Sequence, residues 1–494
     1  MKKNALRTLA VLLALLNAGS VLAACAAKDD SSGNDTTPAL SDANTSADTE
    51  DYDSLEARRL LSDNLPDEKF DGQKYRVLTI NEVDNYIASP EVQEGDVVED
   101  AVFQRNSRIE DRFDVKIDVN SPTTHRETGA LLERLVNAQD DAYEIYAGHA
   151  IVAGGNAVNG MFLNWHDIDY VDFTRPWWSQ NSVEALTLNG RMFLVPTYYT
   201  ISVIGNTYCM YYNKTIAADR NLENIYDVIN NKQWTLEKMR TMVADIYTDL
   251  NGNGKEDADD AYGLSITSLS PAVTFTWAFD MDIIDIDEDY NFEITFGSER
   301  NATIYQDLFN LYYRTTGVTT SGNDHGYSIY TFNKGNTLLC SGLFDHSLSI
   351  LREFEDPYAI IPYPKYDDQQ EEYYSMLDGG HVIIGIPITS TNTAFAGIIT
   401  EAMTAESWKY IIPNYYDVAL KVKGARDEES IAMMDLIMDA VKVDLAYIYD
   451  NWNGYAFALQ DMLQAKNENF ASYVKGKMKH HTKWYTKVIN RFTE

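Results

Sequence analysis

The segment Asp249–Asp260 places oxygen-bearing side chains at regular intervals, in the run DLNGNGKEDADD. Its first, third, fifth, ninth and twelfth positions are Asp249, Asn251, Asn253, Asp257 and Asp260. Calcium prefers oxygen ligands, and a twelve-residue loop with this spacing supplies them, with a sharp glycine turn at position six and a backbone carbonyl at position seven. Gly254 and Lys255 occupy those two positions. We therefore expect the loop to hold a structural calcium ion.

The loop departs from the usual calcium pattern at its end. Asp260 stands where a longer Glu is common, and AYGLSI after it predicts a strand, so no paired helix–loop–helix sensor is formed. The preceding apolar periodicity predicts a helix from Thr235, a candidate N-cap, to Thr248. The alternative is a solvated acidic turn without an ion. We expect calcium to stabilise this turn, between the helix and the strand after Gly263, rather than to be the protein's function.

Aromatic side chains are candidates for a second kind of chemistry, the binding of a sugar. A sugar has hydroxyls at its rim and C–H groups on its faces, so its site needs flat aromatic platforms and short polar groups. The chain has 33 Tyr, 18 Phe and 8 Trp. Trp177 and Trp178 are adjacent in the polar run TRPWWSQN, and we expect at least one to face a ligand; the alternative is packing on the domain surface. Only one of Tyr198 and Tyr199 can point into a cleft, and we select Tyr199.

No catalytic constellation stands out. The sequence has no GxSxG, HExxH or paired CxxC motif, so we expect neither enzyme activity nor an organic cofactor. Carboxylates are so numerous that some pair must have glycosidase spacing by chance, which keeps a secreted glycan-active enzyme open as an alternative. The formal net charge of −35, from 75 acidic and 40 basic residues, disfavours nucleic acid as a partner.

The N-terminus predicts export. Residues 1–25 have a basic start, a short apolar core and small residues before Cys25, and Leu22–Cys25 resembles the lipobox cut by bacterial lipoprotein signal peptidase. We expect lipidation of Cys25 to anchor the protein at the cell surface, on the outer face of the cytoplasmic membrane or facing the periplasm. An ordinary secretory peptide is the alternative. Residues 26–67 are expected to be a disordered acidic stalk. Of the two other cysteines, Cys209 and Cys340, we favour two buried thiols over one bridge.

Strands and helices alternate at the start of the folded region. Strands are expected at 75–80, 114–119 and 143–148, with helices at 97–113 and 127–139 between them. This order predicts an α/β fold with a parallel sheet and helices on its faces. Ligands bind at the carboxyl ends of strands in such sheets. Asn81 and Glu82, and also Gly148 and His149, should therefore lie at the edge of a cleft.

Three segments resemble the extracellular solute-binding proteins of ABC importers, specifically the carbohydrate-type family 1 that includes maltodextrin-binding proteins. The run NGRMFLVPTYYTISVIGNTYCMYYNK is similar to the segment in which that family's chain leaves its first lobe. FNKGNTLLCSGLFDHSLSIL is similar to a second-lobe segment, and DGGHVIIGIPITSTNTAFA to the segment that crosses back. The matches follow the family's order and cover the chain from about Tyr75 to Leu420.

The resemblance implies a two-lobed, periplasmic-binding-protein-like (type II) fold with hinge strands and a central ligand cleft. Lobe one is expected at 68–200 plus 386–440, and lobe two at 201–385 plus 441–494. Such a protein, expected to be a monomer, closes around a solute and delivers it to the permease subunits of an ABC transporter. A sugar or oligosaccharide is the favoured solute. A peptide or another small polar solute is an alternative, as is a metal-stabilised surface adhesin.

The resemblance and the positions of the crossings add ligand-binding candidates. Trp277 equally suits a helix core, and the Asp345 carboxylate could either accept sugar hydroxyls or cap its helix. Gly380 permits close approach of the backbone to a ligand. The added candidates are Trp277, Phe344, Asp345, Gly380, His381 and Trp452.

The C-terminal run YVKGKMKHHTKWYTKVINRF is basic although the chain is acidic. We favour a solvated helix face, and the alternatives are contact with acidic permease loops or with anionic lipid headgroups. His480 and His481 are adjacent, so they do not share a helix face as two metal ligands would.

Overall fold

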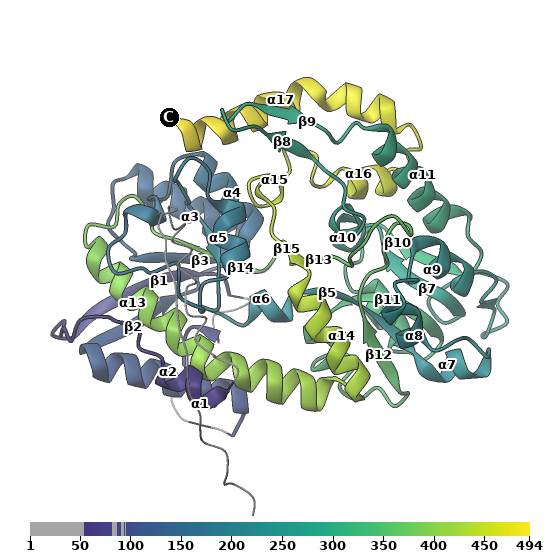
Figure 1. Cartoon of the computed structure of the whole chain (residues 1–494), viewed down its shortest axis with the longest axis horizontal. Coiled ribbons are helices and arrows are strands. Elements are labelled where there is room, and N and C mark those ends of the chain that lie inside the picture. Colours follow the sequence, from purple (N-terminus) through teal and green to yellow (C-terminus); the bar gives the residue numbers. More distant parts are fainter. Residues whose placement is uncertain (1–53, 82–85, 90–92, 94) are drawn as a thin grey trace, which may run out of the picture. The chain divides into compact units, whose positions relative to one another are not determined.

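The computed structural model describes residues 54–81, 86–89, 93 and 95–494 (Figure 1). The leader, Cys25, the first part of the expected stalk and Glu82 lie outside the described residues. Among the helices of the described ranges, none is long and apolar enough to cross a membrane.

The folded chain begins earlier than the sequence indicated. Residues 54–67 were expected to belong to a disordered stalk, but helix α1 (Leu55–Leu60) forms there, with the Ser54 side chain accepting the Ala57 N–H. Asp63 is buried and accepts a 2.9 Å hydrogen bond from the Arg112 guanidinium. The pairing with Arg112 lowers the pKa of Asp63 although burial opposes that shift. This part-buried ion pair attaches the segment to the end of helix α2 (Val97–Phe113).

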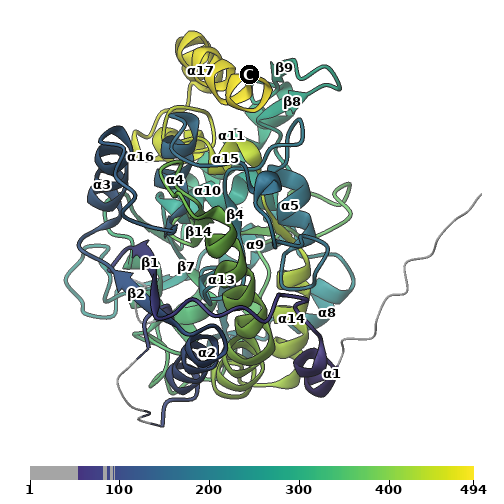
Figure 2. The same cartoon turned by 90° about the vertical axis from the view of Figure 1, so that its left-hand side faces the viewer.

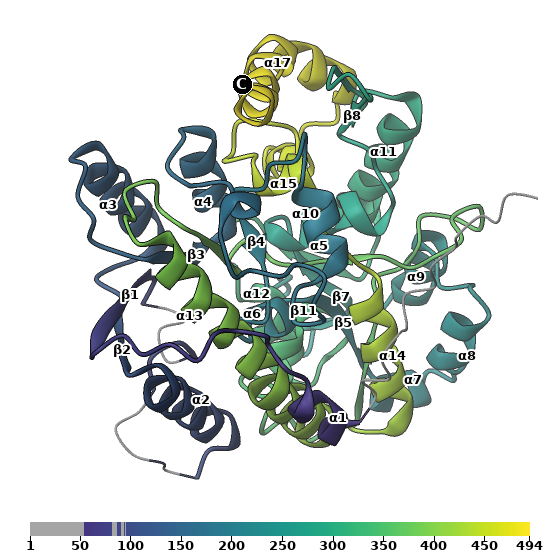
Figure 3. The same ribbon diagram turned by 60° about the vertical axis from the view of Figure 1, so that its left-hand side comes forward.

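The first sheet contains the predicted parallel strands. Its order is β2-β1-β3-β14-β4, with β1 parallel to both β2 and β3 and with β14 antiparallel to β3. Helices α2 and α13 pack on each other beside these strands (Figure 3). The elements are β1 (Gln73–Thr79), α2 (Val97–Phe113), β2 (Val115–Asn120), α3 (His125–Asn137), β3 (Ile145–His149), α4 (Ala150–Val158), β4 (Val195–Pro196), β14 (Val382–Gly385) and α13 (Thr393–Glu406). The predicted strand–helix alternation is thus confirmed.

A second, mixed sheet follows in the order β10-β7-β11-β5-β12, with β6 paired to β7. Cys209 in β5 and Cys340 in β11 are both buried and unbridged, as favoured from the sequence. Its strands are β5 (Tyr208–Asn213), β6 (Tyr247–Thr248), β7 (Ala261–Thr267), β10 (Val318–Ser321), β11 (Thr337–Leu343) and β12 (Tyr358–Ile361). The flanking helices include α7 (Lys214–Asp219), α8 (Ile225–Asn230), α9 (Leu236–Val243), α10 (Ser270–Ala278), α11 (Glu299–Arg314) and α12 (Tyr327–Phe332).

The chain passes between the two sheets near the expected crossings. The first passage leads from β4 to β5, through the short helix α6 (Ser202–Gly205). The return passage follows β13 (Ser375–Met376), where Leu377 bridges to Thr207 and Val382 then pairs with His149 of β3. A third passage follows α13, through the wide helical turns Ser407–Ile411 and Asn414–Gly424.

Two segments pack differently from the expected lobe boundaries. Helix α14 (Glu428–Asp439), expected in lobe one, packs on β12 of the second sheet, where the Ser430 hydroxyl accepts the Ile360 N–H at 3.2 Å. Helix α15 (Leu445–Ile448), expected in lobe two, packs on α4 beside the first sheet. A Cβ on Gly154 of α4 would lie 1.8 Å from the Ile448 carbonyl oxygen, so this contact requires glycine.

The C-terminal part is mostly helical, and the basic run at its end lies on a helix as expected. After β15 (Val441–Lys442) and α15, helix α16 (Ala458–Gln464) packs on α10, and α17 (Phe470–Thr493) extends to the end of the chain. The hairpin of β8 (Ile284–Ile286) and β9 (Phe292–Ile294) lies against α17, where Phe292 and Tyr485 are in ring contact (Figures 1 and 2).

The predicted helix from Thr235 to Thr248 is too long. Thr235 caps it as expected, with its hydroxyl accepting the Lys238 N–H, but α9 ends at Val243. The backbone of Asp245 has a left-handed conformation, with φ of 61°, and strand β6 begins at Tyr247. Ile246 is buried although it lies just before β6 and not in the helix. Its spacing from Val243 and Met242 nevertheless continues the helical pattern of apolar residues in the sequence. The expected calcium loop therefore connects two antiparallel strands, β6 and β7.

Candidate ligand-binding site

Trp452 is the one predicted ligand-binding aromatic that is substantially exposed, at 37% of its surface. It and Asn451 are consecutive left-handed residues, with φ of 56° and 45°. Non-glycine residues in this region cost free energy and persist only where surrounding contacts impose them. A Cβ on Gly155 of α4 would lie 2.5 Å from the Asn451 side chain, so Asn451 packs into the space that this glycine leaves open. The close packing on α4 thus holds Trp452 at the surface.

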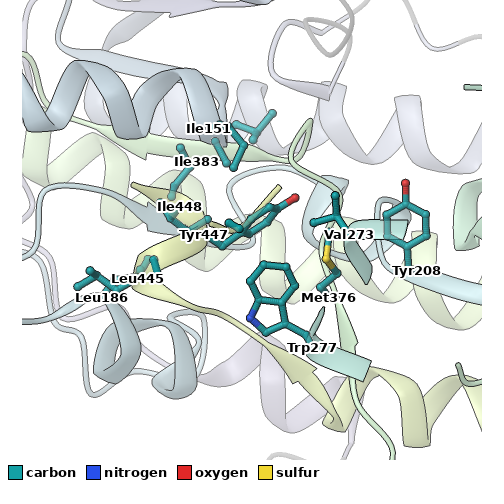
Figure 4. Packing of buried hydrophobic residues seen from close by; sticks show 14 of the residues in the cluster. Ile151, Leu186, Tyr208, Val273, Trp277, Met376, Ile383, Leu445, Tyr447 and Ile448 are labelled. Carbon is teal, nitrogen blue, oxygen red and sulfur yellow. The ribbon is translucent and has the colours of Figure 1, made fainter. Parts of the chain in front are cut away.

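An aromatic series leads from Trp452 into the core. Trp452 lies 5.8 Å from Phe457, Phe457 lies 5.7 Å from Tyr447, and Tyr447 lies 4.7 Å from Trp277, between ring centroids. Figure 4 shows Tyr447 between Trp277 and the side chains of Ile151 and Ile383. Trp277 is 4% exposed, so it forms the buried end of the series and does not contact a ligand itself. The ring of Trp452 is therefore rigidly backed.

Nitrogen-bearing side chains surround the Trp452 ring at the carboxyl ends of two parallel strands. The Arg126 guanidinium lies 4.4 Å from the ring centroid, and the His149 ring lies 6.1 Å from it. His149 is stacked on His125 at 4.6 Å. His149 ends β3, and His125 and Arg126 begin α3 after β2. The site thus combines a partly exposed indole with a guanidinium that lies over its ring and an imidazole beside it, and such aromatic and donor groups suit a sugar.

The loop Asp378–His381 lies at the return passage and joins this cluster to the second sheet. The Asp378 carboxylate accepts the Tyr208 hydroxyl at 2.9 Å and the Gly380 N–H at 2.8 Å. The His381 Nδ1 lies 2.7 Å from the Asp378 carbonyl oxygen. Gly380 is half-buried and His381 is 1% exposed, so both act here as structural members of the passage.

Burial keeps the His149 and His381 imidazoles neutral. It lowers the pKa of His149 to about 3, with nearby His125 acting in the same direction, and lowers the pKa of His381 to about 4. Within the described residues, His149 Nδ1 and His381 Nε2 are buried without a hydrogen-bond partner. A neutral imidazole offers one donor and one acceptor, so the half-buried His149 is the ring of the two that suits a sugar hydroxyl.

Trp177 and Trp178 do not face a ligand, contrary to the expectation. Both are buried, and their indole N–H groups donate to the two carboxylate oxygens of Glu401 at 2.7 and 2.8 Å. Burial raises the pKa of Glu401 to about 7. The polar neighbours in TRPWWSQN suggested exposure. Both indoles are buried in the core because the Glu401 carboxylate of α13 accepts their N–H groups there.

Tyr199 and Phe344 are also fully buried, which corrects their assignment. The Tyr199 hydroxyl lies 3.5 Å from that of Tyr75, and burial raises the pKa of Tyr199 to about 12. Tyr198 is the half-buried member of that pair and lines a small cavity of about 80 Å³. Phe344 donates its backbone N–H to the Thr207 carbonyl at 3.1 Å and so joins β11 to the first passage.

Asp345 lies in a different depression, whose lining does not include Trp452. It is half-buried, accepts hydrogen bonds from the Ser349 and Tyr415 hydroxyls, and does not cap its helical turn. Burial raises the pKa of Asp345. The depression has a volume of about 360 Å³, within the range of small-molecule sites, and is also lined by Tyr86, Val97 and Arg352.

The expected calcium loop brings its oxygen-bearing side chains together. The Asp257 carboxylate accepts the Asn251 and Asn253 side-chain amides, at 3.2 and 2.7 Å. Asp249 accepts the Gly252 and Gly254 N–H groups, and Asp260 accepts those of Leu250 and Asp257. Lys255 is at the surface, with its N–H bound to Asn253 Oδ1. In the described ranges, no group of three or more His, Cys, Asp or Glu side chains is arranged to hold a metal ion.

Sequence reasoning placed His149 at a cleft edge but did not select His125, Arg126 or Tyr447. Strand order was the available indicator for the first two. Residues that follow β2 and β3 must meet at one sheet edge because both strands are parallel to β1. Tyr447 had no comparable indicator, since its role depends on contacts with residues far away in sequence.

Solved structures with this arrangement include a cyclo/maltodextrin-binding protein complexed with maltotetraose, at a TM-score of 0.57 and 11% identity over 84% of this chain and 98% of that one. The chain has the solute-binding-protein fold. An ABC substrate-binding protein from Listeria monocytogenes in complex with cycloalternan matches at 0.54 and 10% identity, over 84% and 100% of the two chains. A solute-binding protein from Thermotoga lettingae bound with α-D-tagatose matches at 0.54 and 12% identity, with the same coverage.

The solute-binding-protein fold confirms the predicted two-lobed α/β class. The sequence matches no model of a known protein family, and no curated protein matches it. The structural likeness thus shows the fold alone.

Proposed function

We propose that the protein is an extracellular solute-binding protein that captures a sugar or oligosaccharide and delivers it to the permease of an ABC transporter. The observation that carries this proposal is Trp452, an exposed indole held by left-handed backbone and surrounded by nitrogen donors. The solved proteins of the same fold are described with cycloalternan, tagatose or maltotetraose bound. Nothing in this site requires the protein to change its ligand chemically.

The geometry of the site supports sugar binding. A sugar that contacts the exposed part of Trp452 would bury C–H groups against the indole, while Arg126, which lies over the ring, donates to its hydroxyls. The loop Asp378–His381 leads from β13 to β14, which pairs with β3, and its Asp378 accepts the hydroxyl of Tyr208 in β5. A displacement of one sheet relative to the other would therefore act on this loop. Ligand contacts with both sides would favour the closed arrangement by their differential binding free energy.

A thermal-shift screen of the purified protein tests the proposal. We expect one or more oligosaccharides to raise Tm, because a ligand stabilises the folded state in proportion to the logarithm of its concentration over its dissociation constant. The ligand should be recovered intact, and product release would instead support the alternative of a glycan-active enzyme. A shift with peptides or amines, and none with any saccharide, would refute the carbohydrate assignment.

We also propose that the loop Asp249–Asp260 holds calcium as a structural ion. Each carboxylate has about four acceptor sites, so Asp249 and Asp260 keep lone pairs free beside their N–H bonds. Millimolar calcium is expected to raise Tm by about 2–5 °C, and a chelator to reverse this.

The control for calcium is a second acidic turn of the same chain. Asp287 accepts the Asn291 and Asp289 N–H groups but lacks the twelve-residue spacing. Asp249→Ala should abolish the calcium-dependent shift, whereas Asp287→Ala should leave it intact. Equal shifts in both variants would mean that calcium acts through general surface charge.

The membrane anchor belongs to the same proposal. Cys25 is the acceptor for the lipid, and the described residues from Ser54 onward would be attached through the preceding acidic segment. An acylated cysteine would keep the protein beside its permease on the outer face of the membrane.

A further inference from the structure

Helix α17 has four exposed lysines at intervals of four residues: Lys475, Lys479, Lys483 and Lys487, here called the lysine row. An α-helix has 3.6 residues per turn, so residues four apart form a continuous ridge, which here is about 18 Å long. Lys477 is also exposed nearby. From Phe470 to Thr493 the helix has no acidic side chain, although the whole chain has a formal net charge of −35.

The stability of the helix does not explain the lysine row. Like charges four residues apart destabilise a helix by mutual repulsion. The helix dipole favours cations only near the C-terminal end, whereas Lys475 and Lys479 belong to the first half of α17. In the part of the chain that the structure describes, no ion pair involves a lysine of the row. Within the described residues, no carboxylate therefore neutralises these charges, which leaves them to act on an external partner.

The opposite face of α17 is the one that packs against the protein. Val474, His481, Tyr485, Val488 and Phe492 are buried. The acidic β8–β9 hairpin also lies on this side, through the contact of Phe292 with Tyr485, about 200° around the helix from Lys483. The protein thus presents the lysine row outward and places its neighbouring acidic hairpin behind it.

A groove of about 630 Å³ lies along the second half of the row. Lys483, Trp484, Lys487 and Arg491 line it, together with Val158 of α4 and Glu494. Trp484 is half-buried and donates its indole N–H to the Tyr449 carbonyl at 3.0 Å. Lys487 donates to Asn159 at 2.6 Å and Arg491 to the Phe162 carbonyl at 3.1 Å, so this half of α17 is held on α4.

We propose that the lysine row docks α17 on an anionic phospholipid surface. Evenly spaced lysines suit a diffuse negative surface, because each ammonium is a flexible point charge, whereas a defined carboxylate on a protein is better matched by the planar fork of arginine. Clustered lysines near a membrane are attracted to anionic headgroups, and a partly exposed tryptophan favours the same interface. The lysine row would turn α17 toward the membrane, whereas the acidic remainder of the protein is repelled by anionic headgroups.

Vesicle co-sedimentation tests this proposal with the chain carrying Cys25→Ser, which cannot receive a lipid. Vesicles of phosphatidylglycerol mixed with phosphatidylcholine are compared with vesicles of phosphatidylcholine alone, at low and physiological salt. We expect binding to the anionic vesicles only, weakened by salt. Changing the four lysines of the row to glutamine should lower the partition coefficient by about 1,000-fold at low salt, since each lysine near an anionic surface contributes about tenfold or a little less.

The matched control changes Lys74, Lys116, Lys232 and Lys334 to glutamine, which alters net charge equally but removes lysines paired with carboxylates elsewhere on the surface. We expect this variant to bind vesicles as the parent chain does. Loss of the row should leave Tm unchanged or raise it, because repulsion within α17 is removed. Equal loss of binding in both variants, or no preference for anionic vesicles, would overturn the proposal. So would unchanged vesicle binding by the row variant accompanied by a transport defect, which would make the partner a protein.

Discussion

Replacing Trp452 with alanine is expected to weaken saccharide binding by about 100-fold, because a central buried aromatic contact contributes about 2–3 kcal/mol or more. The indole is the exposed end of the series that continues through Phe457 and Tyr447 to Trp277, so its loss removes the platform while the buried members stay packed. Isothermal titration with the saccharide that gives the largest thermal shift measures the change. The effect on Tm without ligand should be small, since 37% of the side chain is exposed.

Two variants separate platform loss from a general disturbance. Trp452→Tyr keeps a flat ring and should recover most of the affinity. Tyr330→Ala removes another exposed aromatic, at 57% exposure, from α12 of the second sheet and should leave affinity unchanged. Full affinity in Trp452→Ala would place the ligand elsewhere, and the depression beside Asp345 would then be the next site to test.

The parts of the fold that depend on local pattern were predictable from the sequence. Helix α2 spans the expected 97–113, and β1, β2 and β3 form the expected parallel sheet, because periodicity and chain order determine both. The end of α9 was not predictable in this way. Ile246 continues the apolar repeat of the helix, yet its burial comes from tertiary packing after the left-handed turn at Asp245.

The site was predicted less well, since burial of a polar or aromatic group depends on partners distant in sequence. Trp177 and Trp178 are core residues because of Glu401, more than 220 residues along the chain. Trp452 was named from its position, but its rigidity comes from Gly154 and Gly155 of α4. No local pattern links these segments.

Glu401 to alanine is the substitution expected to destabilise the protein most. The change leaves two buried indole N–H groups, those of Trp177 and Trp178, and the Asp172 N–H without their acceptor. Unsatisfied buried donors cost about 1–3 kcal/mol each, so the free energy of unfolding should fall by about 3–5 kcal/mol. Chemical denaturation followed by tryptophan fluorescence measures the loss.

The ionisation of Glu401 adds a pH dependence whose sign is fixed by its raised pKa. Burial raises the pKa to about 7 from an ordinary value of 4.5, so the folded state holds this proton more tightly than the unfolded state. The stability that protonation contributes is therefore complete below about pH 4.5 and is lost as pH rises to about 7, by at most about 3 kcal/mol.

Glu401→Gln keeps one carbonyl acceptor and cannot ionise. The stability of the parent chain relative to Glu401→Gln should thus fall between pH 5 and pH 8. Asp450, whose pKa burial also raises to about 7, is present in both proteins, so its contribution cancels in this difference. A difference that stays constant with pH would show that Glu401 is ionised throughout and binds the two indoles as a carboxylate.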